Sequence, residues 1–235
     1  MYKIIIAISF FCITGCFTTK DLPSYKTGTI SIKPKKDDVF TKPSLTNYMK
    51  STKNPTFVLR VPKQIDDILD ENKYSKSQIY NTIEKELAKA DFIVRDRALY
   101  QKVLDQNIVS DYSKIKELTN TDLILELVNY ENINFNTNKY IDAKGRDKTI
   151  DGNFTLKGVK IEFKLIKVKE NDLVGSYSFF YSPCSDGCKY TFDSNGNLYA
   201  NNNRKKMTMP YEFVSSDNLE DFFKSCAKRL INELK

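Results

Sequence analysis

Histidine is absent from this 235-residue chain, and glycine is scarce, with eight residues in all. Without histidine, a Ser-His-Asp triad, a Cys-His pair and a histidine-based zinc site are excluded. The glycines are scattered, so no glycine-rich loop is present to cradle a phosphate. Adjacent carboxylates occur at 37–38, 66–67 and 220–221, but neighbouring side chains point in different directions on a helix or strand. We therefore expect no enzyme activity, no metal site and no cofactor.

The first sixteen residues carry the strongest pattern in the sequence. Lys3 supplies one positive charge, and residues 4–13 form an almost unbroken apolar stretch. Its length is typical of a secretory signal core and too short to span a bilayer as a helix. Residues 13–16, Ile-Thr-Gly-Cys, resemble the lipobox of bacterial lipoprotein precursors. The resemblance implies a signal peptide at 1–15, cleavage before Cys16 and a lipid anchor on that cysteine. The alternative is a buried N-terminal strand with an incidental cysteine.

Export determines how the charge of the chain is interpreted. The formal charge of +7 includes Lys3, so the chain from Cys16 carries +6. No aromatic-studded basic motif is present, and we expect no nucleic acid partner. In a cell envelope the surplus favours anionic lipid headgroups or acidic wall polymers. Phe17, rather than aspartate, follows the lipid cysteine. Where lipoproteins are sorted by this residue, Phe17 predicts an outer-membrane location facing the periplasm.

Residues 16–55 are predicted to be a lipidated, flexible and disordered tether. The segment is rich in Thr, Ser, Lys and Pro, with Pro23, Pro34, Pro43 and Pro55 spaced along it. No helical or alternating apolar period is present. A flexible chain of this length has a root-mean-square reach of roughly 35 Å.

Residues 56–235 are long enough to form one substantial core. Apolar periodicity and capping residues predict, in chain order, strand 57–61, a helix capped by Ser75, strand 92–94, helices capped by Asp96 and Asp111, strand 123–128, a hairpin of 159–165 with 174–181, and a helix from Asp217. This order predicts an α/β (α+β) fold in which helices pack on a mixed β-sheet.

Residues 129–153 interrupt these elements with a stretch dominated by Asn, Asp, Lys and Thr. The composition predicts a polar loop, or a short hairpin through Ile133, Phe135 and Tyr140. Gly158, just beyond this stretch, predicts a bulge or kink at the start of the hairpin that follows.

Several segments resemble CsgG-type lipoproteins, a group that includes the curli secretion protein and the LpoB-like activators of cell-wall synthases. The segments that carry the resemblance are 83–90, 92–97, 99–104, 121–127, 159–165 and 175–177. The resemblance covers most of residues 56–235 and implies a CsgG/LpoB-like domain that binds another envelope protein or itself. Asp96 and Arg97 within it are either a helix cap with a solvated arginine or part of a binding site. The polar region 129–153 departs from the pore-forming members, which favours an adaptor.

Cysteine usage suggests one covalent link. Cys184 and Cys188 enclose three residues, and in an oxidising compartment they predict a small disulfide loop. Two reduced thiols, or half of a metal site, are the alternatives. Cys226 falls on the apolar stripe of the last predicted helix and is expected to be a buried core residue.

Residues 193–197 have the Asp-x-Asn-x-Asn spacing that begins a calcium loop, but Arg204 stands where an EF-hand needs a glutamate. Asn195-Gly196 between aromatic neighbours predicts a type I′ hairpin turn instead. We expect such a hairpin to be exposed and to form a partner surface through Tyr190, Phe192 and Tyr199.

The sequence therefore predicts a membrane-anchored envelope lipoprotein that acts as a non-catalytic, protein-binding adaptor or activator. One alternative is a subunit of an oligomeric secretion or surface-assembly complex. Another is an envelope hydrolase, which would need a cleft lined with carboxylates.

Overall fold

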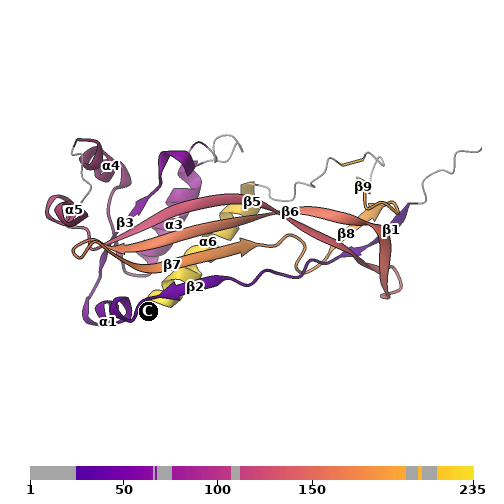
Figure 1. The fold of residues 1–235 in the computed structure, drawn as a ribbon, viewed down its shortest axis with the longest axis horizontal. Helices are drawn as coiled ribbons and strands as arrows, with labels where there is room; N and C mark the ends of the chain where they lie inside the picture. Colours follow the sequence, from indigo (N-terminus) through magenta and orange to yellow (C-terminus); the bar gives the residue numbers. More distant parts are fainter. Residues whose placement is uncertain (1–24, 66, 68–75, 107–111, 200–205, 208–215) are drawn as a thin grey trace, which may run out of the picture.

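The computed structural model describes residues 25–65, 67, 76–106, 112–199, 206–207 and 216–235 (Figure 1). The predicted signal peptide, the lipidation site Cys16, the caps Ser75 and Asp111, and Arg204 lie outside these residues. The described helices are α1 (Pro43–Ser51), α3 (Lys76–Lys89), α4 (Arg97–Gln106), α5 (Tyr112–Thr119) and α6 (Ser216–Leu234). None of them is long and apolar enough to cross a membrane.

The strands form one sheet. They are β1 (Lys26–Ile30), β2 (Asp38–Thr41), β3 (Thr56–Arg60), β4 (Ile93–Val94), β5 (Leu123–Asp142), β6 (Asp147–Lys167), β7 (Asp172–Tyr181), β8 (Cys188–Phe192) and β9 (Leu198–Tyr199). The order is β2-β7-β6-β5-β1-β8-β9, and β3 joins as a parallel partner of both β4 and β5. The other pairings are antiparallel, so the predicted mixed sheet with helices packed on it is confirmed.

Two long strands run the length of the molecule and give it an elongated shape (Figure 1). β5 has 20 residues and β6 has 21, and they pair from Leu123↔Lys167 to Ile141↔Asp147. At roughly 3.3 Å per residue, each strand is about 65 Å long. Residues 129–153 are thus mostly the far half of this hairpin. The prediction of a polar loop was wrong. The alternative, a short hairpin, correctly predicted paired strands but underestimated their length.

At one end, which we call the head, α3 and α6 cover one face of the sheet and lie behind the strands in Figure 1. Their apolar stripes meet alternate residues of β3, β5, β6 and β7. The interior of the head includes fully buried Phe57, Leu125, Leu165, Tyr177 and Phe223. Burial of such side chains is the main source of stability, at about 1.5–3 kcal/mol for each large apolar residue.

At the other end, which we call the tip, the apolar face of the hairpin is reversed. Tyr130 and Ile161, paired across β5 and β6, face α3 and α6. Phe135 and Leu156, paired farther along, belong to a separate core. Because successive side chains of a strand alternate between faces, these odd separations place the second core on the opposite face of the sheet. The tip core contains Ile30, Ile32, Phe135, Tyr140, Ile150, Phe154, Leu156, Phe192 and Leu198.

Gly158 lies where the buried face changes. No register shift occurs there, so the predicted bulge is absent. A side chain at position 158 would instead meet the ring of Phe135 and the backbone oxygen of Tyr181. The close packing at this position explains the glycine.

Residues 26–51 correct the prediction of a flexible tether. They form β1, β2 and α1, and the sheet includes both strands. Ile30 and Ile32 are buried in the tip core, and Leu45 is fully buried in the head. Pro43 begins α1, a position where proline suits a helix, rather than breaking the structure. These elements depend on partners more than a hundred residues away, which no local period could reveal.

Candidate protein-binding face

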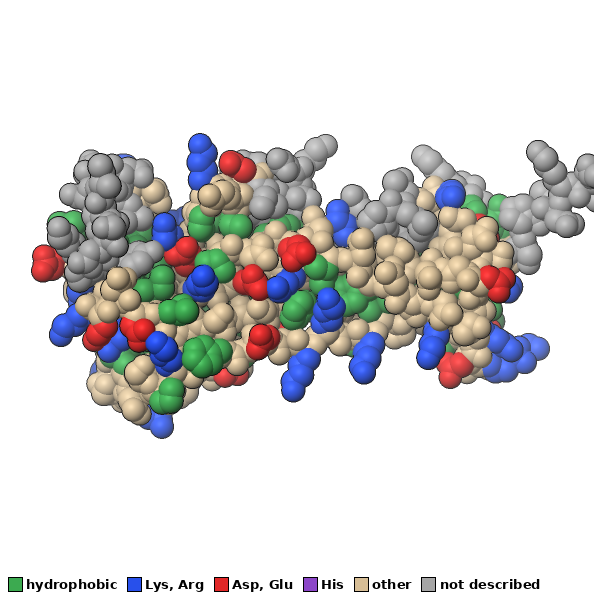
Figure 2. Space-filling view, in the orientation of Figure 1, with side chains coloured by type: hydrophobic (Ala, Val, Ile, Leu, Met, Phe, Trp, Pro, Cys, Tyr) green, Lys and Arg blue, Asp and Glu red, His purple; other side chains and the backbone are tan. Residues whose placement is uncertain are grey.

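The described residues cover only part of the face of the head sheet opposite α3 and α6. α4 and α5 pack over one end of it, where Val58, Ile124 and Tyr100 form a small third core. The tip core lies on the same side at the far end. Between these two covered ends, strands β5, β6, β7 and β2 present side chains outward, and this is the surface turned to the viewer in Figure 2.

We call this surface the open face. Its members are placed by strand register, since residues directly opposite one another share a face. They are Arg60, Glu126, Lys164, Ser176 and Phe40 in one row, Asn129, Glu162, Ser178 and Asp38 in the next, and Glu131, Lys160 and Phe180 in a third. Three cationic and four anionic side chains therefore share this face, so its charges nearly balance. The balance of charge does not suit a polyanion, but it is compatible with a protein partner.

Ion pairs fix part of this surface. Arg60 donates to a carboxylate oxygen of Glu126 at 2.8 Å, beside the covered end. Lys160 lies 2.6 Å from Glu162, which also accepts a hydrogen bond from Ser178 at 3.2 Å. The hydrogen bond from Lys160 is the main reason that the pKa of Glu162 is lowered, and it raises the pKa of Lys160 in turn. Both groups therefore stay ionised at neutral pH.

Phe40 gives the open face an exposed apolar group. Its side chain is 51% exposed on β2, the strand at the edge of the sheet. Lys42 donates its amide to Val174 on β7 at 2.9 Å. Antiparallel alternation therefore turns the backbone groups of Val39 and Thr41 away from β7, toward the outside of the sheet. An exposed ring beside outward-facing backbone groups is suited to binding an extended segment of another chain.

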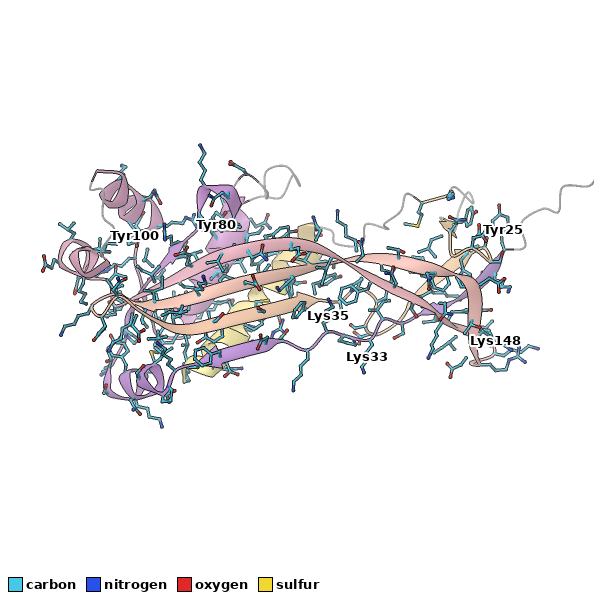
Figure 3. All side chains as sticks on the ribbon, in the orientation of Figure 1. Tyr25, Lys33, Lys35, Tyr80, Tyr100 and Lys148 are labelled. Carbon is cyan, nitrogen blue, oxygen red and sulfur yellow. A yellow bond between two sulfur atoms is a disulfide. The ribbon has the colours of Figure 1, made fainter. Side chains whose placement is uncertain are left out.

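The segment between β1 and β2 borders the open face. Lys35 (labelled in Figure 3) lies over the rings of Phe135 and Phe180, at 5.6 and 5.5 Å from their centroids. Its amide donates to the Ser182 hydroxyl at 3.2 Å. This cation therefore links the tip core to the last row of the open face. We call residues 31–37 the strap.

Asp96 and Arg97, the most distinctive residues of the family resemblance, lie near the covered end. α4 begins directly after Asp96, as a cap at that position predicts. The Arg97 guanidinium lies 4.4 Å from the ring centroid of Tyr80 and 3.5 Å from Glu84. Burial raises the pKa of Glu84 despite this neighbour. Arg97 is therefore a packed side chain rather than a solvated one.

A pocket of about 170 Å³ opens beside these residues and is lined by Leu59, Arg60, Val61, Tyr80, Arg97, Ala98, Tyr100 and Gln101 (Figure 3 labels Tyr80 and Tyr100). Each arginine of the lining already faces a carboxylate outside it. The lining residues do not bring together a nucleophile and a base. In the part of the chain that the structure describes, no group of three or more Cys, Asp or Glu side chains could hold a metal ion.

The two cysteines predicted to pair are joined in the structure as a disulfide between Cys184 and Cys188. The loop that they close packs on the strap, because Ile32 donates its amide to the Cys184 oxygen at 3.2 Å. Burial raises the pKa of Tyr190, whose hydroxyl lies 3.9 Å from the Cys184 sulfur, to about 12. Cys226 is fully buried, which confirms its prediction as a core residue.

The predicted partner surface was wrong. Phe192 is fully buried and Tyr199 is 8% exposed, so both belong to the interior of the tip. The ring of Phe192 packs edge-on against Tyr140 and Phe154, at 4.7 and 4.9 Å between centroids. Tyr190 is half-buried against the same core. The aromatic hairpin therefore supplies the core of the tip and does not form a contact surface.

The turn between β8 and β9 is built around Asp193. Its carboxylate accepts hydrogen bonds from the amides of Asn195 and Asn197 at 2.9 and 3.0 Å, from the Asn197 side chain at 2.8 Å, and from the Tyr199 hydroxyl at 2.9 Å. Burial acts to raise the pKa of Asp193, but these bonds hold it below the usual value. The hairpin is confirmed, but Gly196 alone of the central pair has a positive φ, so the turn is not type I′.

The sequence did not predict the open face, because Phe40 lies inside the segment predicted as a tether. The run Asp-Val-Phe-Thr, residues 38–41, is too short for its alternation to be distinguished from chance. Lys160, Glu162 and Lys164 were placed correctly on the wet side of a strand. Nothing in their pattern showed which part of that side would stay uncovered.

Comparisons with known proteins give structural likenesses only. No protein-family model matches the chain, and no curated protein matches it. Among solved structures, PelC from Paraburkholderia phytofirmans, solved as a dodecamer, is 11% identical with a TM-score of 0.37, covering 86% of this chain and 99% of PelC. Lipoprotein GNA1162 from Neisseria meningitidis is 9% identical with a TM-score of 0.31, covering 76% and 99%.

A homolog of the neuraminyllactose-binding hemagglutinin from Helicobacter pylori is 13% identical with a TM-score of 0.37, covering 86% of this chain and 91% of that one. At such low identity, the functional inference for this chain depends on its own residues. The resemblance to CsgG-type lipoproteins stays a prediction.

Proposed function

We propose that this chain is a lipid-anchored protein of the bacterial cell envelope that binds another protein through the open face, without catalysis. The anchor is Cys16, and the location that Phe17 favours is the outer membrane, facing the periplasm. The β5–β6 hairpin then acts as a rigid spacer between the anchored tip and the head. Because this hairpin runs through both the tip and the head, it fixes the distance between them, which a flexible tether would not.

The observation that carries this proposal is a sheet face that the described part of the chain leaves uncovered, with an exposed phenylalanine at its edge. Most large apolar residues of the head are buried, yet Phe40 is 51% exposed on that face. Leu173, on the adjacent strand β7, is 40% exposed. Apolar groups among charges of both signs are typical of surfaces that bind proteins. The nearby pocket offers no catalytic constellation, so adaptor function agrees better with this surface than hydrolysis does.

A photo-cross-linking experiment tests the proposal in living cells. The photoreactive amino acid p-benzoylphenylalanine replaces Phe40 in the tagged full-length protein, and in a second strain it replaces Ile93. Ile93 is the matched control because it is also an exposed apolar residue, 44% accessible, on the edge strand β4. We expect one recurrent envelope protein to be captured at position 40 and not at position 93. Equal capture at both positions, or none at position 40, would reject the open face.

Self-association is the second candidate, and the free edge of β2 favours it. The outward backbone groups of Val39 and Thr41 could pair with a strand of a neighbouring copy as readily as with a different protein. The same experiment separates the two. A ladder of self-linked species from position 40, with no second protein, would identify a subunit of an oligomeric assembly.

A further inference from the structure

The tip carries the first described residue of the chain. Tyr25 lies at the far end of the molecule from α1 and α5, and Figure 3 labels Tyr25 and Lys148 at that same end. Cys16 precedes Tyr25 by nine residues. Nine residues span at most about 30 Å when fully extended. If Cys16 bears the lipid, as the proposed function requires, the tip is held near the bilayer surface.

Exposed cations outnumber exposed acids on the tip. The exposed basic residues are Lys26, Lys139, Lys144, Arg146, Lys148, Lys189 and Lys206. The exposed acidic residues are Asp147, Asp151 and Asp186. Seven positive and three negative charges leave +4. Adding the half-buried Lys157 and Asp142 and the buried Asp193 gives eight positive and five negative charges, or +3.

Two acids of the tip are already bound within the protein. The carboxylate of Asp142 accepts two hydrogen bonds from the Arg146 guanidinium, at 2.9 and 2.7 Å, and one from the Lys144 amide at 2.8 Å. Asp193 is buried in its turn with four donors. The charge of Asp142 is therefore offset by Arg146, whereas Asp193 keeps its negative charge inside the turn. The lysines counted above are exposed.

Tyr25 adds an amphipathic group to this surface. Its ring is 36% exposed and packs edge-on against Tyr199, 4.8 Å between centroids, so it is held at the rim of the tip core. Tyrosine is enriched where proteins meet the headgroup layer, because its ring is apolar and its hydroxyl is polar. Ile141, 38% exposed, is the other large apolar side chain on this rim.

We propose that the tip is a membrane-contact surface that binds anionic phospholipid headgroups through its lysines and Tyr25. This contact rests on the proposed lipid anchor and extends it. A lipid on nine residues of chain restrains distance but not orientation, whereas a charged tip pressed on the headgroups orients the β5–β6 hairpin away from the bilayer. The open face is then presented at a defined height above the membrane.

Spin-label relaxation on vesicles tests this contact. Lipidated full-length protein is labelled at Thr149→Cys on the tip, or at Ala88→Cys on α3, both exposed positions. The protein is reconstituted into vesicles of pure phosphatidylcholine, or with 30% phosphatidylglycerol, that carry a nickel-chelating lipid as the relaxation agent. On the anionic vesicles we expect the tip label to relax at least twofold faster than on phosphatidylcholine. The head label should not respond.

Salt and charge reversal provide the second readout. In 0.5 M NaCl the screening length falls to about 4 Å, so the difference between vesicles should disappear. Lys144→Glu with Lys148→Glu should abolish it as well, whereas Lys50→Glu with Lys53→Glu, the same charge change on the exposed head, should not.

Two failures are distinguishable. Protein that floats with the vesicles but whose tip label responds equally to both compositions would overturn the headgroup contact alone. Protein that does not float with either vesicle would overturn the lipid anchor, and with it the placement of the tip at the membrane.

Discussion

Asp37 and Arg229 form an ion pair that fastens the strap to α6. The other carboxylate oxygen of Asp37 accepts a hydrogen bond from the Phe180 amide at 3.2 Å. The Arg229 guanidinium in turn lies 4.9 Å from the ring centroid of Phe179. One carboxylate thus connects the strap, strand β7 and the last helix. The pairing of β2 with β7 stops at Asp38↔Ser178, and the Asp37 side chain, rather than a backbone oxygen, accepts the hydrogen bond of the next β7 amide, that of Phe180.

Replacing Asp37 with asparagine should destabilise the protein by about 1–2 kcal/mol. The ion pair with Arg229 is lost, and the Phe180 amide then donates to a neutral oxygen instead of a carboxylate. Urea unfolding monitored by circular dichroism would measure the change. Asp38→Asn is the control, since Asp38 is an exposed neighbour on the open face and should change stability by less than about 0.5 kcal/mol. Equal effects of the two substitutions would contradict the role given to Asp37.

Asp193→Ala should cost about 2–3 kcal/mol, because four donors lose their shared acceptor in a buried turn. Asp186→Ala, at an exposed position in the nearby disulfide loop, is the control and should be close to neutral. Thermal unfolding of both variants provides the comparison. A small effect at Asp193 would show that water replaces the carboxylate without loss.

The same carboxylate predicts a pH dependence. The pKa of Asp193 is lowered in the folded protein, so the folded state holds its proton less tightly than the unfolded state does. Its stabilising contribution is therefore complete above the unfolded pKa of about 3.9 and is lost as pH falls through the lower folded pKa. In denaturation curves between pH 7 and pH 2, the free energy of unfolding should fall less with acidification for Asp193→Asn than for the parent chain. Identical acid profiles would exclude Asp193 as a contributor.

Gly152→Ala should also destabilise the tip. A methyl group at this position would meet the backbone oxygen of Asn195, which cannot move away because the turn is hydrogen bonded to β6. We expect a loss of about 1–3 kcal/mol. Asp151→Ala changes the exposed neighbour on the same strand and should be nearly neutral in the same thermal assay.

Reducing the Cys184–Cys188 disulfide should lower the stability of the tip. A loop of this size contributes about 2 kcal/mol in the chain-entropy model. Hydrogen exchange should then rise at the Ile32 amide, which depends on the Cys184 oxygen, and stay unchanged in the head. Cys184→Ser with Cys188→Ser should reproduce the effect without reductant. Faster exchange across the head as well would indicate that the two cores are not independent.

The head was largely predictable because its elements have local signals. The helix carrying Ile79, Ile83 and Leu87 follows a single apolar stripe, and the strand from Leu123 is almost continuously apolar because helices cover both of its faces there. Such periods can be recognised without knowing which other segments the element packs against. The final helix and the hairpin of β6 with β7 were found on the same grounds.

The tip was not predictable in this way. In the far half of β5, only Phe135 and Tyr140 are buried, and the register shift between Thr137 and Lys139 places them on one face despite their odd spacing. A bulge of this kind removes the period of two that identifies a strand. β1 and β2 are short strands, β1 inside the sheet and β2 at its edge. Their strongest signal, the burial of Ile30, requires knowledge of a core assembled from segments far apart in the sequence. The exposed Phe40 was hidden for the same reason.

The continuous β5–β6 ladder has a mechanical consequence. Suppose that the tip is fixed to a membrane and the open face holds a partner. A pulling force between them then enters the sheet through β1, the first strand, and acts along the strand direction. β1 passes this force to β5 and β8, with which it pairs in antiparallel. Hydrogen bonds between strands pulled lengthwise are loaded together in shear, rather than being unzipped one after another. The head and the tip would therefore share the tension through a single sheet. The molecule would resist mechanical force between the membrane and its partner.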